Sequence, residues 1–238
     1  MHYLGIDAGN TRTKFYKLSL GDEEPSEIAP TQIKWNAIQG AVIVRTGKLP
    51  DEVKQQLEKH SVPVLEIHSG IRLPFTNLYQ SASLGADRIA LIAGATELYG
   101  GNVLVIDAGS CITYDFLDDR QQYRGGAISP GIGMRYKALH DYTSDLPLLP
   151  FAPGPPPLTG KTTSEAIHSG VINGVIHEIK GFIERYREIS PSVKVTLTGG
   201  DAEFLSESLK IKIFAIHKNL LARGMQVLLR LNKEDFKL

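Results

Sequence analysis

Two acidic turns carry the residue types that could do chemistry in this 238-residue chain. The first is Asp7-Ala-Gly-Asn-Thr-Arg-Thr-Lys14 and the second is Asp107-Ala-Gly-Ser110. Each aspartate follows an apolar run, and the glycine lets backbone N–H groups approach anionic oxygens closely. The side chains after the first glycine add hydroxyl and amide donors and, at Lys14, a positive charge. This combination suits the phosphates of a nucleotide.

The aspartates themselves need a different role, because a carboxylate repels phosphate. We interpret each as a residue that holds a cation or its waters. The alternative is a pair of purely structural turns in which Asp caps its own backbone. The turns belong to a longer repeat, which favours the functional interpretation and a duplicated domain. The following residues each recur 100 positions later: Leu4, Ile6, Asp7, Ala8, Gly9 and Thr13.

A third motif, Gly85-Ala-Asp87-Arg88, falls where a loop enters an expected helix. An acid next to an arginine at a helix start could orient an alcohol and an anion together. The alternative is that Asp87 caps the helix and Arg88 faces solvent. Taken by itself, the motif favours that alternative.

Strands and helices alternate along the chain, which predicts an α/β fold. Each acidic turn joins two strands of a hairpin, and the pairs Gly125-Gly126 and Pro130-Gly131 indicate a turn before a helix. From Ile167 to Ile183 apolar residues recur every fourth position, and Thr162 with Glu165 predicts a capping box. The proline-rich stretch 152–159 cannot be helical. The other expected elements are strands at 41–46, 64–67 and 193–197 and helices at 51–60, 85–99, 134–140 and 220–231.

Composition narrows the class of protein. Lysine plus arginine and aspartate plus glutamate both number 26, so the chain lacks the basic excess of a nucleic-acid binder. With a mean hydropathy of −0.10 and no apolar run near 18 residues, we expect no membrane span. The only cysteine, Cys111, excludes an intrachain disulfide and fits a reducing cytoplasm.

Taken together and in order, the motifs resemble the type III pantothenate kinases, of the actin-like and sugar-kinase-like ATPase superfamily. The resemblance covers almost the whole chain. It implies two tandem RNase H-like domains, 1–101 and 102–238, with an ATP cleft between them. The motifs that carry it are Asp7–Lys14, Leu84-Gly-Ala-Asp-Arg88, Asp107–Ser110, Gly125-Gly-Ala-Ile-Ser-Pro-Gly131, Thr163–Gly170 and Thr198-Gly-Gly200.

The resemblance implies ATP-dependent phosphorylation of the terminal hydroxyl of pantothenate, which yields 4′-phosphopantothenate for coenzyme A synthesis. It also implies Mg²⁺ with the ATP, a monovalent cation (K⁺ or NH₄⁺) held by Asp107, and a homodimer. Gly199 and Gly200 would lie near the adenosine. The ATP-binding residues would be Asp7, Ala8, Gly9, Asn10, Thr11, Arg12, Thr13, Lys14 and Ser110.

The resemblance assigns proton abstraction from the substrate hydroxyl to Asp87. Pantothenate would be framed by Tyr79, Gly85, Ala86, Asp87, Arg88 and Thr163. The chain departs from the family pattern in several places, among them Cys111, where alanine is usual, and the proline run before Gly160. Ser110 replaces a threonine, Lys161-Thr162-Thr163 replaces an Asn-Thr pair, and Tyr79 is one residue closer to Gly85 than expected.

Two other functions remain open on the sequence. One is a kinase of the same fold that acts on a sugar or a carboxylic acid. The other is a regulatory protein that senses a nucleotide without catalysis. Retention of Asp7, Lys14 and Asp87 favours a kinase over the sensor.

Overall fold

The computed structural model describes residues 2–81, 83–151, 154, 156–211 and 213–236. Its first sheet has the strand order β3-β2-β1-β4-β5, in which β1 runs antiparallel to β2 and parallel to β4. Helix α1 (Asp51–Lys59) separates β4 from β5 in the chain. The strands are β1 (His2–Ala8), β2 (Thr13–Leu18), β3 (Ser26–Ile28), β4 (Ile38–Arg45) and β5 (Val64–Glu66).

The second sheet repeats this order. Read from its other edge, it runs β6-β9-β8-β7-β10-β11. Apart from the additional strand β6, the strands β9, β8, β7, β10 and β11 take the places of β3, β2, β1, β4 and β5 in the first sheet. The duplication predicted from the two acidic turns is therefore confirmed, and the fold class is α/β. The strands are β6 (Thr76–Asn77), β7 (Val103–Ala108), β8 (Cys111–Leu117), β9 (Gln122–Pro130), β10 (Lys194–Thr198) and β11 (Ala215–Ile216).

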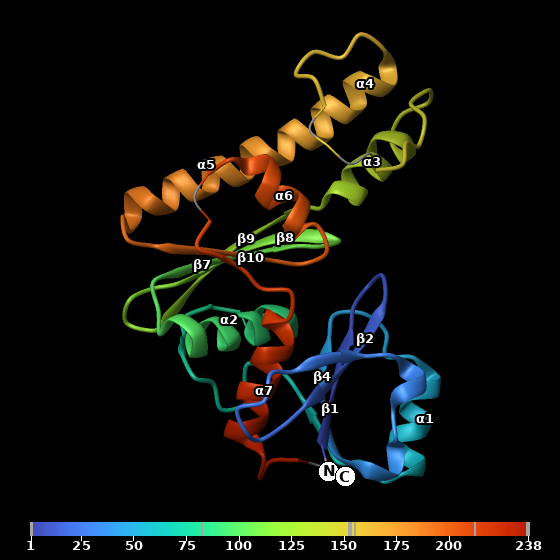
Figure 1. The fold of residues 1–238 in the computed structure, drawn as a ribbon, viewed down its shortest axis with the longest axis vertical. Helices are drawn as coiled ribbons and strands as arrows, with labels where there is room; N and C mark the ends of the chain where they lie inside the picture. The colour runs from blue at the N-terminus through green and yellow to red at the C-terminus, as the bar shows by residue number, and fades with distance from the viewer. Residues whose placement is uncertain (1, 82, 152–153, 155, 212, 237–238) are drawn as a thin grey trace. The chain divides into compact units, whose positions relative to one another are not determined.

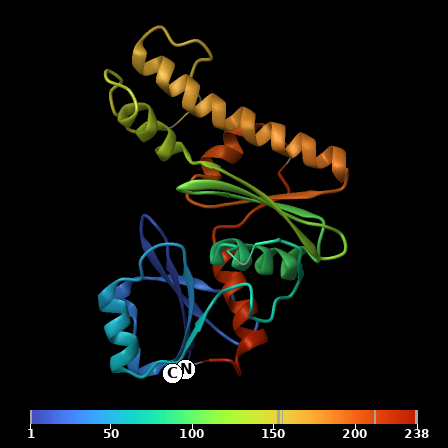
Figure 2. The ribbon, with the colours of Figure 1, turned by 180° about the vertical axis from the view of Figure 1, so that it is seen from behind.

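The two halves differ in what connects the third and fourth strands. Two short 3₁₀ turns, Pro30–Gln32 and Trp35–Ala37, join β3 to β4. Between β9 and β10 the chain instead forms α3 (Ile132–Asp141), α4 (Thr163–His168), a π-helical turn (Ser169–Asn173) and α5 (Gly174–Ile189). Figures 1 and 2 show α5 and α6 (Ala202–Leu209) over one face of the second sheet, where they enclose its apolar core.

Helices α2 (Ala86–Tyr99) and α7 (Leu220–Asn232) pack against each other backbone to backbone. A Cβ at Gly94 would lie 2.6 Å from the carbonyl oxygen of Leu220, and one at Gly224 only 1.7 Å from that of Ala90. Glycine normally weakens a helix, but here it permits this close approach. The helix predicted at 85–99 therefore forms despite Gly94.

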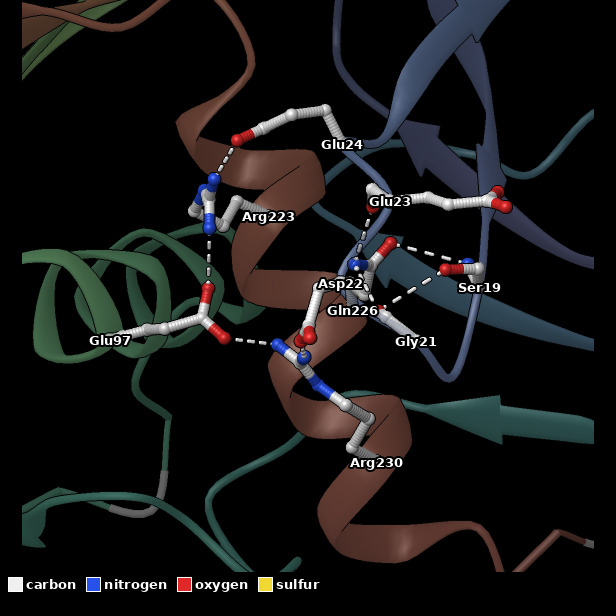
Figure 3. Close-up of polar contacts among 9 residues, drawn as sticks. All are labelled: Ser19, Gly21, Asp22, Glu23, Glu24, Glu97, Arg223, Gln226 and Arg230. Carbon is white, nitrogen blue, oxygen red and sulfur yellow. Dashed lines mark hydrogen bonds and ion pairs between the residues drawn. The ribbon is translucent and has the colours of Figure 1, made fainter.

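Polar contacts hold α7 to the rest of its unit (Figure 3). Glu97 of α2 lies between Arg223 and Arg230 of α7 and forms ion pairs with both. The buried Gln226 accepts the N–H of Ser19 at 3.2 Å and donates to the carbonyl of Glu23 at 2.9 Å. Both sides of α7 are thus tied to elements from the first half of the sequence.

This packing changes the domain boundaries expected from the sequence. One unit comprises 1–101, 117–125 and 219–238, and the other comprises 102–116 and 126–218. In this grouping α7 and residues 117–125, which the sequence places in the expected domain 102–238, lie in the unit of the N-terminal strands. Helix α7 belongs to this unit because its backbone packs closely on that of α2 at Gly94 and Gly224. The order of elements in the sequence does not reveal this contact.

The expectation of a turn at Gly125-Gly126 is wrong, because both residues lie inside β9. A Cβ at Gly126 would lie 1.5 Å from the carbonyl oxygen of Tyr114 on β8, so glycine allows these strands to approach. Gly125 has φ +91°, which marks an irregularity in the strand.

The capping box forms in a modified way. Thr162 Oγ1 accepts the N–H of Glu165 at 3.2 Å, but the Glu165 carboxylate accepts the N–H of Lys161 and not that of Thr162. In the proline-rich stretch, residues 154 and 156–159 are non-helical as predicted, while 152, 153 and 155 lie outside the described residues. Within the described part of the chain, no helix combines the length and apolar character needed to traverse a bilayer.

Candidate functional site

The first acidic turn places Asp7 directly opposite Lys14 across the β1–β2 hairpin. Directly opposed residues of an antiparallel pair extend to the same face of the sheet, so the two charges face the same side. Burial raises the pKa of Asp7 to about 6, Lys14 opposes that rise, and the charge of Asp87 adds to it. Asp7 and Asp87 thus interact electrostatically within one unit.

The backbone of this turn is fixed by the segment that follows β4. The carbonyl of Ala8 accepts N–H groups from Thr46 at 3.1 Å and Gly47 at 2.8 Å. A Cβ at Gly47 would lie 2.5 Å from the carbonyl oxygen of Gly9, so a larger residue would push the turn away. The next three residues, 10–12, are exposed. The turn therefore has a fixed base and a polar tip that is open to a ligand.

The start of α2 holds Asp87 and Arg88 in different environments. Asp87 is half-buried, and its Oδ1 accepts the N–H of Arg88 at 2.8 Å. A Cβ at Gly85 would lie 2.5 Å from that same oxygen, so a larger residue before the helix would displace the Asp87 carboxylate. Arg88 is only 5% exposed, so the alternative in which it faces solvent is wrong.

Two tyrosine rings lie beside the Arg88 guanidinium. Its central carbon lies 5.5 Å from the ring centroid of Tyr79 and 5.9 Å from that of Tyr123. The structure therefore brings Tyr79 to Arg88 in spite of its altered spacing from Gly85. Sequence reasoning missed Tyr123, because the adjacent Gly125-Gly126 indicated a turn and concealed strand β9.

In the second unit, two glycines pack against the other acidic turn. A Cβ at Gly131 would lie 2.2 Å from the carbonyl oxygen of Gly109. Gly199, with φ +95°, lies so close that a Cβ would be 2.3 Å from the Ala108 carbonyl oxygen and 2.5 Å from Asp107 Oδ1. These close approaches explain Gly131 of the Gly125–Gly131 motif and Gly199 of the Thr198–Gly200 motif.

The Asp107 carboxylate offers oxygens of the kind that hard cations bind. It is half-buried, and a Cβ at Gly199 would lie within 2.5 Å of both its Oδ1 and the Ala108 carbonyl oxygen, so these two oxygens lie close together. Among the described residues, no cluster of three or more His, Cys, Asp or Glu side chains could hold a metal. A cation at either turn would therefore be held by at most two such side chains, with backbone oxygens, water or a bound phosphate as its other ligands.

The remaining predicted residues lie at separate places in the second unit. Ser110 is exposed at the tip of its turn. Thr163 is the exposed first residue of α4, directly after the Thr162 cap. A Cβ at Gly160 would lie 2.3 Å from the backbone nitrogen of Ala166, so the preceding loop packs tightly on the start of this helix.

Comparison with known proteins gives a consistent result. The family model for type III pantothenate kinase matches residues 3–185. A type III pantothenate kinase from Christiangramia forsetii is 43% identical over 204 residues, covering 85% of this chain and 83% of that protein. Another, from Flavobacterium psychrophilum, is 42% identical over 242 residues, covering 97% and 99% of the two chains.

Solved structures share the fold. A Campylobacter jejuni protein, described as a candidate Baf family transcriptional activator, aligns with a TM-score of 0.63 at 25% identity, covering 97% of this chain and 99% of that one. Component A of the (R)-2-hydroxyglutaryl-CoA dehydratase of Acidaminococcus fermentans aligns with a TM-score of 0.51 at 15% identity, covering 98% of each chain. At that identity, the second likeness concerns the fold alone.

Proposed function

The chain belongs to the type III pantothenate kinase family, and from this premise we propose that Asp87 is the general base of pantothenate phosphorylation. The reaction transfers the γ-phosphoryl group of ATP to the terminal hydroxyl of pantothenate, the first step of coenzyme A biosynthesis. The observation that carries the proposal is the half-buried Asp87 carboxylate at the start of α2, which the N–H of Arg88 holds at 2.8 Å. Its charge contributes to the raised pKa of Asp7 in the turn assigned to the ATP phosphates.

A hydrogen bond supports the role of Asp87 as general base. Its Oδ1 is held by the N–H of Arg88, which fixes the carboxylate and leaves Oδ2 for the hydroxyl proton of pantothenate. Arg88 and Tyr79, together with Gly85, Ala86 and Thr163, would bind and orient that substrate. Positioning of this kind matters because enzymes accelerate phosphoryl transfer mainly by aligning the reactants and neutralising charge, with little covalent participation of protein groups.

The first turn would bind the ATP phosphates. Its exposed tip supplies backbone N–H groups and the side chains of residues 10–13, and Lys14 supplies positive charge. Asp7, held opposite Lys14, would bind Mg²⁺ through the waters of the ion. Bound Mg²⁺ neutralises charge on the phosphate oxygens.

The main test is the turnover of Asp87→Asn in a coupled assay of ADP release with pantothenate and ATP. We expect turnover to fall by about 10²–10⁴-fold, since a positioned base contributes that much. The affinity for ATP should stay unchanged. Asp119→Asn, which makes the same change at an exposed position, is the matched control. Near-wild-type turnover of Asp87→Asn would rule out its role as base.

Asp107 would hold the monovalent cation. We expect full activity with K⁺ or NH₄⁺ and a clear loss in buffer containing only Na⁺. Asp107→Asn should remove this difference, because the carboxylate beside Gly199 is the only charged donor that we assign to the cation. Equal wild-type activity in Na⁺ and K⁺ would contradict this assignment.

The likeness to a protein described as a transcriptional activator makes a second function worth testing. In that case the chain would bind ATP and regulate a partner without phosphorylating pantothenate. Purified protein that binds ATP but shows no turnover on pantothenate or on a panel of sugars and carboxylic acids would support it. Balanced charge argues against direct contact with nucleic acid.

The protein would act as a homodimer. Support comes from apolar side chains that are exposed in the second unit, among them Ile128 at 63% and Tyr142 at 89%. A hollow of about 520 Å³, lined in part by Tyr142, lies between α3 and the π-helical turn. Analytical ultracentrifugation of the wild-type chain, with Tyr142→Ser as a variant that weakens association, tests this.

The protein would work in the cytoplasm. The substrates ATP and pantothenate are soluble, and the chain has a single cysteine, as is usual in a reducing compartment. Fractionation of cells that express the tagged chain provides the measurement.

A further inference from the structure

We propose that Tyr123 is a positioning residue for pantothenate binding, acting through Arg88 and Tyr79. The inference rests on the proposed function, which assigns those two residues to the substrate. Tyr123 lies on β9, far in sequence from both, and its side chain is fully buried. It would not touch the substrate itself.

The ring of Tyr123 faces the buried guanidinium. The central carbon of Arg88 lies over the rings of both Tyr79 and Tyr123, at 5.5 and 5.9 Å from their centroids. A guanidinium at this distance is attracted by the electron-rich face of an aromatic ring. Two ring faces therefore restrict the positions that the Arg88 side chain can take.

Tyr123 also supports the other ring. The rings of Tyr79 and Tyr123 stack at a centroid distance of 6.2 Å with an interplanar angle of 30°. On its far side, Tyr123 meets Phe75 edge to face at 6.0 Å. Tyr123 is thus the central ring of a cluster that connects β9 with the residues assigned to pantothenate.

Backbone contacts fix the same segment. The carbonyl of Tyr123 accepts the N–H of Leu78 at 3.1 Å, and Asn77 pairs with Tyr123 between β6 and β9. The Asn77 side chain in turn accepts the N–H of Tyr79 at 3.0 Å. Since these contacts do not need the phenol ring, replacing the ring should disturb Arg88 and Tyr79 without detaching the segment.

The test is steady-state kinetics of the full-length variants Tyr123→Leu and Tyr123→Phe with pantothenate and ATP. Leucine removes the ring face, so we expect the KM for pantothenate to rise about tenfold. The kcat and the KM for ATP should stay within about threefold, because Asp87 and the phosphate-binding turn are unchanged. Phenylalanine retains the ring face and should restore the KM for pantothenate to within about twofold of the wild type.

A control separates positioning from a general loss of packing. Trp35 packs against the apolar core formed by β1, β4 and α1 in the same unit. Its ring stacks on that of His60, with 6.4 Å between the ring centroids. Trp35→Leu should lower the thermal unfolding midpoint but leave the KM for pantothenate unchanged. If Tyr123→Leu does not fold, Tyr123→Met removes the ring with a more adaptable side chain and is measured in its place.

The outcomes distinguish this inference from the proposed function. A wild-type chain without turnover on pantothenate overturns the proposed function and the inference with it. An active wild type whose ring-deleted variant keeps its KM for pantothenate overturns the inference alone. The inference is also overturned if Tyr123→Leu lowers kcat but leaves the KM for pantothenate unchanged. It is overturned as well if Tyr123→Phe raises the KM for pantothenate as much as Tyr123→Leu does.

Discussion

The two acidic turns occupy equivalent places in the two sheets and yet are built differently. In both, a central strand ends with Asp-Ala, and the alanine carbonyl accepts an N–H from the chain that follows the neighbouring parallel strand. Ala8 receives this bond from Gly47 after β4, and Ala108 receives it from Asp201 after β10. The strand frame is therefore shared.

The turns differ in length and surroundings. Residues 9–12 separate β1 from β2, whereas only 109 and 110 separate β7 from β8. The first turn exposes polar side chains, while Gly131 and Gly199 enclose the backbone of the second. The same arrangement of strands thus presents side-chain donors at the first turn and backbone oxygens at the second. This difference matches the phosphate-binding and cation-binding roles proposed above.

Among changes within the two turns, the largest effect should come from the aspartate of the first turn. We expect Asp7→Asn to lower kcat/KM for ATP by about 10²–10³-fold, the usual cost of removing a preorganised electrostatic group. Asp107→Asn, assayed in saturating K⁺, should cost clearly less. Equal losses in the two variants would mean that the turns do not have separate roles.

Glycines at the two turns should differ in their effect on stability. Gly199→Ala combines positive φ with backbone collisions, and we expect it to lower the free energy of unfolding by about 3 kcal/mol. In Gly47→Ala the new Cβ would collide with the Gly9 carbonyl oxygen, but the backbone φ is not positive. We expect this variant to lower the free energy of unfolding by about 2 kcal/mol.

Urea denaturation measures both variants. Gly133→Ala serves as control, because its Cβ would meet no atom within 4 Å and alanine favours the α3 helix. It should stabilise the protein by up to about 1 kcal/mol. If Gly47→Ala lowers the free energy of unfolding more than Gly199→Ala does, the prediction that the second turn tolerates alanine less well is wrong.

Stability should also depend on pH through Asp7. Burial raises its pKa to about 6, so between pH 4 and 6 the folded state binds more protons than the unfolded state. The contribution of Asp7 to the free energy of unfolding is present below pH 4 and is lost as the pH rises through 6. Relative to the wild type, ligand-free Asp7→Asn should gain about 1–2 kcal/mol between pH 4 and 7. Thermal unfolding across this range measures the gain, and a constant difference would contradict it.

The smallest effect is expected at the tip of the second turn. Ser110→Thr retains the hydroxyl, and the added methyl group lies at an exposed position. We expect kcat and both KM values to stay within about threefold of the wild type. A larger change would show that this turn is more enclosed during turnover than its exposure indicates.

Much of the fold could be predicted from local patterns. The hairpins at both turns, the helices at 51–59 and 86–99 and the final helix all form close to where their periodicity places them. Strand β9 was missed because Gly126 is typical of a turn, whereas here it admits the carbonyl of Tyr114. The burial of Arg88 was missed because the partner ring, Tyr123, comes from that same strand.

The amino-acid sequence alone determined the repeated Asp-Ala-Gly hairpins, the α/β class and the resemblance to a kinase family, because strand alternation, turn chemistry and motif order are encoded over short stretches. Only the tertiary structure decided that α7 joins the unit of α2 and that Tyr123 lies beside Arg88. Both outcomes depend on side chains and backbones that meet across more than 30 residues of sequence, where shape and not local propensity selects the partner.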